Sequence, residues 1–179
     1  MKVFWDIDGT IMLNPLPSPN WDDPAARHPT TGEPISGQMP IYNSRAVLNS
    51  ELTSSDIRQI KYVITSRPEF RRETTVRQLQ QHGIKCDVLV MSPEIYDRDL
   101  WAKYKAIELI NWDADYYIDN DPLFCLRVQG YLMDYKASCL CMNVREWHDL
   151  KKRYGCDELM YQKSSEIPKN KPQKTNHRA

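Results

Sequence analysis

Short apolar runs alternate along this chain with longer stretches in which apolar residues recur at helical spacing. Five of the runs are rich in β-branched residues and lack a polar face, as is typical of strands covered on both sides: 3–7, 62–65, 88–91, 116–119 and 139–144. Strands that alternate with helices predict right-handed crossovers and a parallel sheet with helices on both faces. We therefore expect an α/β fold, a three-layer α/β/α sandwich with about five parallel strands.

Each stretch between the strands carries residues suited to begin or end a helix. The first, which includes Leu52 and Ile57, can be split in two by the polar residues at 54–56. The expected boundary residues are, in chain order, Ser44 for the first helix, Pro68 and Gly83 for the second, Asp99 for the third, and Asp121 with Pro122 and then Gly130 for the fourth.

Two segments break the alternation. Residues 12–43 hold seven prolines together with Trp21 and Tyr42, which predicts an ordered loop or small hairpin lying over the sheet edge as a lid. Residues 158–179 are polar and are expected to be disordered. At 179 residues the chain can form one sizeable core but hardly two, so we expect a single domain over 1–157.

Charge and composition exclude several classes of function. Lys plus Arg and Asp plus Glu number 24 each, so no global charge draws the protein to nucleic acid or an anionic membrane. No apolar run is long enough to span a bilayer, and the first strand leaves no room for a signal peptide, so a soluble, cytoplasmic protein is expected. The five cysteines form no CxxC pair and the four histidines are scattered, which disfavours a zinc site.

Polar residues stand at the carboxyl ends of three expected strands. Asp6 lies at the end of the first, Thr65 at the end of the second and Asp119 at the end of the fourth. In open parallel sheets ligands bind beyond these ends, so one crevice of a Rossmann-like sheet can gather all three side chains.

The spacing of Asp6 and Asp8 suggests a metal. Residues two apart in an extended segment project to one side, where two carboxylates repel each other and any phosphate. A Mg²⁺ ion prefers oxygen ligands and removes both objections, and Asp119 can complete its ligand set. Gly9 lets the backbone leave the strand sharply and brings N–H groups toward an anion.

Around such an ion the two aspartates can take different tasks. One carboxylate can attack phosphorus and form an aspartyl phosphate. The other can protonate the leaving oxygen and later activate water. Phosphoryl transfer also needs donors and positive charge on the remaining oxygens, for which Thr65 and Lys105 are candidates.

In four places the sequence resembles the haloacid-dehalogenase-like phosphohydrolases. The four stretches follow the family's motif order: DIDGT at 6–10, VITSR at 63–67, KAIEL at 105–109 and YYIDND at 116–121. This resemblance implies Asp6 as nucleophile, Asp8 as general acid and base, Thr65 and Lys105 as phosphate stabilisers, and Asp119 with Asp6 and Asp8 around Mg²⁺. We expect Gly9, Thr10, Ser66 and Arg67 to contact the substrate.

Three assignments stay open at this point. Ser66 competes with Thr65 for the hydroxyl of the second motif, and Lys103 competes with Lys105. In the fourth motif Asn120 stands where the family often has a second acid. Asp121 either substitutes for that acid or caps the following helix.

The short interval between the first two motifs limits the kind of substrate. It is too small for a helical cap domain, so the crevice can admit a polynucleotide end or a phosphoprotein unless an oligomer partner closes it. The sequence is also similar to the phosphatase half of viral polynucleotide kinase-phosphatases, but it has no GxxxxGK[ST] loop and so no kinase half. We expect a nucleotide or nucleic-acid end phosphate as substrate; the alternatives are a 5′-(deoxy)nucleotidase acting on mononucleotides and an inactive binding module.

Overall fold

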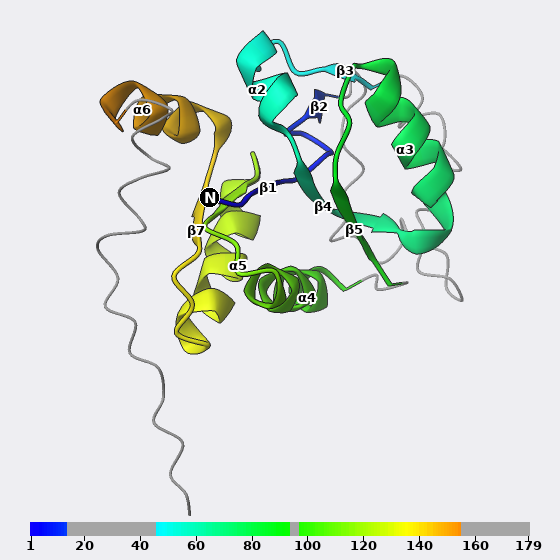
Figure 1. The fold of residues 1–179 in the computed structure, drawn as a ribbon. Helices are drawn as coiled ribbons and strands as arrows, with labels where there is room; N and C mark the ends of the chain where they lie inside the picture. Colours follow the sequence, from blue (N-terminus) through cyan, green and yellow to red (C-terminus); the bar gives the residue numbers. More distant parts are fainter. Residues whose placement is uncertain (14–45, 94–96, 155–179) are drawn as a thin grey trace, which may run out of the picture.

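The computed structural model describes residues 1–13, 46–93 and 97–154. Its core is a five-stranded sheet with helices on both faces (Figure 1). The predicted lid beyond Leu13 and the predicted disordered tail at 158–179 lie outside the described residues. No helix in the described part of the chain combines the length and apolar character needed to cross a membrane.

All neighbouring strands of the five-stranded sheet run parallel, which confirms the predicted fold class. The strand order is β5-β4-β1-β6-β7. The strands are β1 (Val3–Trp5), β4 (Tyr62–Pro68), β5 (Val88–Ser92), β6 (Tyr116–Ile118) and β7 (Leu140–Met142).

This order places a switch point at the central strand. From β1 the chain builds outward through β4 and β5, and then crosses back to build β6 and β7 on the other side of β1. The connections on the two sides of β1 diverge at its carboxyl end, where such sheets leave a crevice. Asp6 directly follows β1 at that point.

Successive residues of the strands point to opposite faces of the sheet, and their side chains pack into two cores, one on each face. Trp5, Val63 and Ile118 belong to the first core, whereas their strand neighbours Phe4 and Ile64 belong to the second. The first core is covered by α2 (Ser54–Gln59), α3 (Arg72–Gln81) and α6 (Val144–Tyr154), and the second by α4 (Arg98–Asn111) and α5 (Pro122–Asp134).

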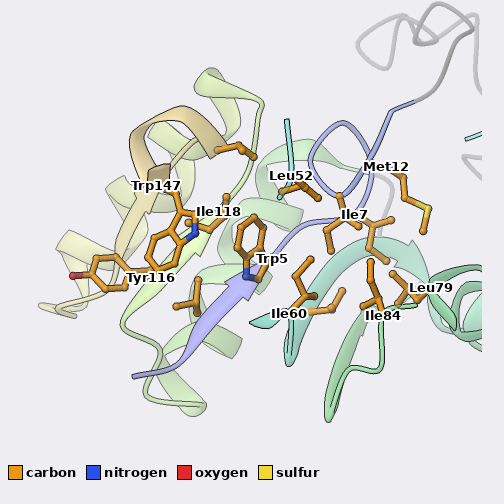
Figure 2. Close-up of a cluster of buried hydrophobic side chains, with 14 of the residues drawn as sticks. Trp5, Ile7, Met12, Leu52, Ile60, Leu79, Ile84, Tyr116, Ile118 and Trp147 are labelled. Carbon is orange, nitrogen blue, oxygen red and sulfur yellow. The ribbon is translucent and has the colours of Figure 1, made fainter. Parts of the chain in front are cut away.

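Aromatic rings dominate the first core. Trp5 meets Trp147 of α6 edge to face, with ring centroids 6.1 Å apart, and Tyr116 packs on the same indole at 5.8 Å (Figure 2). The edge-to-face arrangement brings the positive rim of one ring to the negative face of the other. These contacts hold α6 against β1, which contains Trp5, and β6, which contains Tyr116.

The expected helix beginning at Ser44 is wrong over its first half. Val47–Leu48 form a short strand, β3, which pairs antiparallel with β2 (Met12–Leu13), while Ser44 lies outside the described residues. The helix begins only after Thr53, whose side chain accepts from the Asp56 N–H in a capping box. The polar residues at 54–56 therefore start a helix instead of splitting one.

Three other boundaries differ from the prediction. Asp97, not Asp99, caps α4, because its carboxylate accepts from the N–H groups of residues 99 and 100. The second expected helix is preceded by a short 3-10 turn, η2 (Glu69–Arg71), directly after Pro68. α5 continues past Gly130 to Asp134, and α6 was not predicted at all.

Candidate active site

Three of the predicted site residues meet at the carboxyl end of the sheet. The Asp6 N–H donates to the Ile118 carbonyl at 2.9 Å, and the Asp119 N–H donates to the Met142 carbonyl at 3.0 Å. These bonds continue the ladder just beyond the strands, so both aspartates keep the register of the sheet. Thr65 lies within β4, beside the first of them.

Lys105 reaches this point from α4 and links the two aspartates. Its Nζ lies 2.6 Å from Oδ1 of Asp6 and 3.7 Å from Oδ2 of Asp119. The Lys105 side chain is only 2% exposed, and a charge so buried is tolerated only with opposite charges beside it. Lys103, the competing lysine, is exposed, so Lys105 is the one brought to the site.

Tyr117 completes this buried network. Lys105 Nζ donates to the Tyr117 hydroxyl at 2.6 Å, and that hydroxyl donates in turn to Oδ2 of Asp119. Burial, followed by the charges of Asp119 and Asp6, raises the pKa of Tyr117 well above its ordinary value. The phenol is therefore a neutral donor that ties the lysine to the aspartate.

The carboxyl group of Asp6 is poised between its two protonation states. Burial raises its pKa from 3.8 to about 7; the charge of Lys105 opposes this rise, while those of Asp119 and Asp8 add to it. For Lys105, burial lowers the pKa, but Asp6 and Asp119 outweigh it and the net shift is upward. Lys105 thus stays charged, and any further cation at this place favours the ionised, nucleophilic form of Asp6.

Asp8 faces a different partner. Arg67 donates to Asp8 through Nε at 2.8 Å and through Nη2 at 2.7 Å, the two-pronged geometry that suits a carboxylate. Arg67 is itself buried, and its remaining Nη1 donates to Gln78 of α3 at 2.7 Å. In this structure, the arginine that we expect to contact substrate pairs with Asp8 and orients it.

The hydroxyl candidates of the second motif differ in their surroundings. Thr65 is 1% exposed, and its Oγ1 accepts from the Arg67 N–H at 3.2 Å, which helps to turn the chain toward Asp8. Ser66 is only partly buried. Thr65 is therefore buried near the carboxyl end of β4, and Ser66 lies nearer to solvent.

The loop after Asp8 is held by its own hydrogen bonds. Gly9 has φ +88°, which favours glycine, and its N–H donates to the Met12 carbonyl at 2.7 Å. Thr10 is fully buried, and its hydroxyl accepts from the Asn120 N–H at 2.9 Å. Both residues stabilise the loop through these hydrogen bonds, and their contact with substrate stays a prediction.

The three polar residues that end the fourth motif differ in role: one faces the candidate site, and the other two hold neighbouring segments together. The Asn120 amide donates to the Gly9 carbonyl at 2.9 Å and accepts from the Val144 N–H at 3.3 Å, so it joins three segments. Asp121 caps α5 by accepting from the Phe124 N–H at 3.0 Å, and it also pairs with Arg98. Of the three residues, only Asp119 faces the lysine.

The donor set fits Mg²⁺ in chemistry and only in part in arrangement. Asp6 and Asp119 offer carboxylate oxygens, which the ion prefers, and in this structure both face the Lys105 ammonium. Asp8 is turned to Arg67, and no group of three His, Cys, Asp or Glu side chains within residues 1–13, 46–93 and 97–154 is arranged to hold a metal. Asp8 would have to exchange its guanidinium partner to join the other two.

Two features of the site were missed from the sequence. Tyr117 looked like an ordinary strand residue, although it lies two positions before Asp119 and so projects from the strand to the same side. The contact between Arg67 and Asp8 spans 59 positions and has no local signal. The position of Arg67 as the last residue of the second motif was the one hint of its importance.

Comparisons with known proteins add little to this geometry. No protein-family model matches the sequence, and no curated protein matches it. Among solved structures, a chain of the "Pnkp1/Rnl/Hen1 RNA repair complex" is similar, with 20% sequence identity and a TM-score of 0.46. The match covers 79% of this chain and 42% of that one, so it spans less than half of the other chain's length. At this level, the likeness carries no argument about function.

Proposed function

We propose that this chain is a Mg²⁺-dependent phosphomonoesterase that works through an aspartyl phosphate on Asp6. The observation that carries the proposal is the buried Asp6 carboxylate, held at 2.6 Å by Lys105 beside Asp119 at the switch point of a parallel sheet. A merely structural strand end gains nothing from a raised carboxyl pKa and a buried lysine. The four-motif resemblance to haloacid-dehalogenase-like phosphohydrolases gives the same residues these tasks.

In the first step an Asp6 carboxylate oxygen attacks the phosphorus of a phosphate monoester. The bond between phosphorus and the ester oxygen breaks, and Asp8 gives that oxygen a proton, so an alcohol leaves. Arg67 donates to both oxygens of Asp8 and would orient the side chain for this task. The Lys105 ammonium lies beside Asp6 and is proposed to neutralise phosphoryl oxygens, and the Thr65 hydroxyl is proposed to bind one of them.

In the second step Asp8 takes a proton from water, and the water oxygen attacks the phosphorus. The bond between phosphorus and Asp6 breaks, which releases inorganic phosphate and restores the carboxylate. Mg²⁺, when bound, would supply positive charge that offsets the repulsion between the carboxylates and the phosphate. Asp6 and Asp119 would hold it, joined by Asp8 if that side chain releases Arg67.

The substrate class is inferred from the short interval between the first two motifs, which is too small for a helical cap domain. We propose a nucleotide or the phosphorylated end of a polynucleotide as substrate.

The test is phosphate release from p-nitrophenyl phosphate, with and without Mg²⁺, by the intact chain and by Asp6→Asn. We expect Mg²⁺-dependent turnover in the wild type and a loss of at least about 10³-fold in the variant, because the amide cannot form the acyl phosphate. Asp113→Asn is the matched control: Asp113 is exposed at φ 52°, a conformation that asparagine also adopts. Equal rates in all samples would instead favour a binding module that has lost catalysis.

A further inference from the structure

The outer face of α5 is apolar although it faces away from the core. Phe124, Val128 and Leu132, four residues apart, are buried against the sheet. On the opposite side Leu123 is 66% exposed, and Leu126 and Met133 are each 68% exposed. A helix that is apolar all round is usually covered all round, so this face calls for a partner.

Gly130 lies in the middle of the same face. Its spacing of four from Leu126 and three from Met133 keeps all three residues on one side of the helix. An added Cβ would meet nothing within 4 Å, so the protein's own packing does not require a glycine here. A mid-helix glycine costs about 1 kcal/mol relative to alanine, and a close approach by another backbone accounts for it.

Charged residues flank this face in a pattern that complements itself. Arg127 and Asp134 lie on the same flank, seven residues apart. When two copies of α5 pack antiparallel with Gly130 opposite Gly130, residues whose numbers sum to about 260 face each other. Leu126 then faces Met133 of the other copy, and Arg127 faces Asp134 of the other copy.

We propose that α5 is the contact between two copies of this chain, related by a two-fold axis that passes near Gly130. A two-fold contact uses the same patch on both copies, and this patch supplies both the apolar and the charged partners that it needs. Within one copy, Arg127 has only a weak pairing with Asp99, at 3.6 Å between two half-exposed side chains, so it can turn to the second copy.

The contact is expected to be of moderate strength. One helix of this length presents less than the about 800 Å² per partner of a stable interface. Association is therefore expected at micromolar concentrations. The inference does not depend on the proposed enzymatic activity, since it concerns a different surface.

Sedimentation velocity and light scattering of the full chain, from low micromolar to millimolar concentration, test this contact. We expect a reversible monomer–dimer equilibrium in the wild type and at least about 10-fold weaker association in Leu126→Glu, which buries a charge at the centre of the contact. Val47→Glu is the control, because Val47 is a 53% exposed apolar residue of β3, away from α5 (Figure 1). Circular dichroism verifies that each variant is folded.

A charge exchange shows whether the copies meet in the proposed register. Arg127→Asp and Asp134→Arg should each weaken the dimer, because like charges then face each other, whereas the double variant should recover most of the lost affinity. A wild type that stays monomeric throughout, a dimer unaffected by Leu126→Glu, or a double variant no better than the single ones would overturn the proposal.

Discussion

A buried lysine and the carboxylates around it stabilise one another. Lys105 neutralises Asp6 and Asp119, and without them its ammonium would be a buried unpaired charge. Asp6 and Asp119 were predicted because each stands at a strand end, and Lys105 was predicted from the resemblance of KAIEL at 105–109 to the third motif of the family. The sequence did not predict which other side chain holds them in place.

Tyr117 is that side chain, and Tyr117→Phe tests its role. The substitution keeps the ring but removes the hydroxyl that accepts from Lys105 and donates to Asp119. We expect kcat to fall about 10-fold with little change in KM, and the apparent affinity for Mg²⁺ to fall about 10-fold, as is usual when a group that orients a ligand is lost. Steady-state kinetics measure the first two, and the rise in melting temperature with Mg²⁺ concentration measures the third.

Tyr62→Phe is the matched control for this change. Tyr62 starts β4, and its ring centroid lies 5.2 Å from that of Phe4. Tyr62→Phe therefore also removes one phenol oxygen, but away from the candidate site. An equal effect of both substitutions on the response to Mg²⁺ would mean that Tyr117 has only a general structural role.

At the scale of elements, one carboxylate joins two helices that are far apart in the sequence. Asp56 of α2 is fully buried and accepts from the Thr53 hydroxyl at 2.6 Å, within its own capping box. From α6 it meets His148 at 2.9 Å, Trp147 Nε1 at 3.4 Å and the ammonium of Lys151. Asp56 thus belongs to the capping box of α2 and also binds α6 to this helix.

These contacts make Asp56 a source of stability that depends on pH. Burial alone would raise its pKa, but the hydrogen bonds from Lys151, Thr53 and His148 outweigh burial and hold the pKa below its ordinary value of 3.8. The ionised form is therefore favoured in the folded chain. Its contribution to the free energy of unfolding is fully present above about pH 4 and is lost as the pH falls further.

We expect Asp56→Asn to lower the free energy of unfolding by about 3 kcal/mol at neutral pH, since it leaves a buried ammonium without its partner. The difference from the wild type should shrink as the pH falls below 4. Urea unfolding at several pH values measures it, and repeating the series in a His148→Gln background removes the imidazole's own titration. A difference that does not change with pH would show that Asp56 acts through shape alone.

The errors in the sequence-based elements have different causes. Together with Leu52, Val47 and Leu48 have the apolar spacing of a helix. Their pairing with Met12 and Leu13 in a sheet, however, depends on residues far away in the chain. α6 went unpredicted although Val144, Trp147 and Leu150 recur at helical spacing, because the expected fifth strand was extended to residue 144, where this helix begins. The parallel strands were predictable because they are buried on both faces, and a strand buried on both faces is recognisable by its own residues.

At the scale of the whole molecule, the topology decides where chemistry can occur. The order β5-β4-β1-β6-β7 brings Asp6, Thr65 and Asp119 together from three segments, and that convergence could be predicted from the strand ends alone. The pairing of Asp8 with Arg67 could not, because it depends on how β4 turns into α3. The sequence therefore predicts where the candidate site lies. Which of its side chains pair with one another depends on the packing of segments far apart in the chain.

The molecule's balanced charge bears on the substrate as well. With 24 basic and 24 acidic residues, the protein gains little from general attraction to a polynucleotide. For the proposed polynucleotide substrate, we therefore expect recognition to depend on the terminal phosphate and on the few nucleotides next to it. A short oligonucleotide should accordingly be enough to reach full activity.

We expect phosphate release from a short 3′-phosphorylated oligonucleotide to exceed that from the corresponding mononucleotide, compared as kcat/KM. The reason is that contacts beyond the phosphate add binding energy that the mononucleotide lacks, provided that the crevice is open at the carboxyl edge of the sheet. Sugar phosphates, 5′-phosphorylated oligonucleotides and phosphopeptides measured in the same screen set the scale. Faster turnover of the mononucleotide would identify a nucleotidase, and it would mean that the site is enclosed around a small substrate.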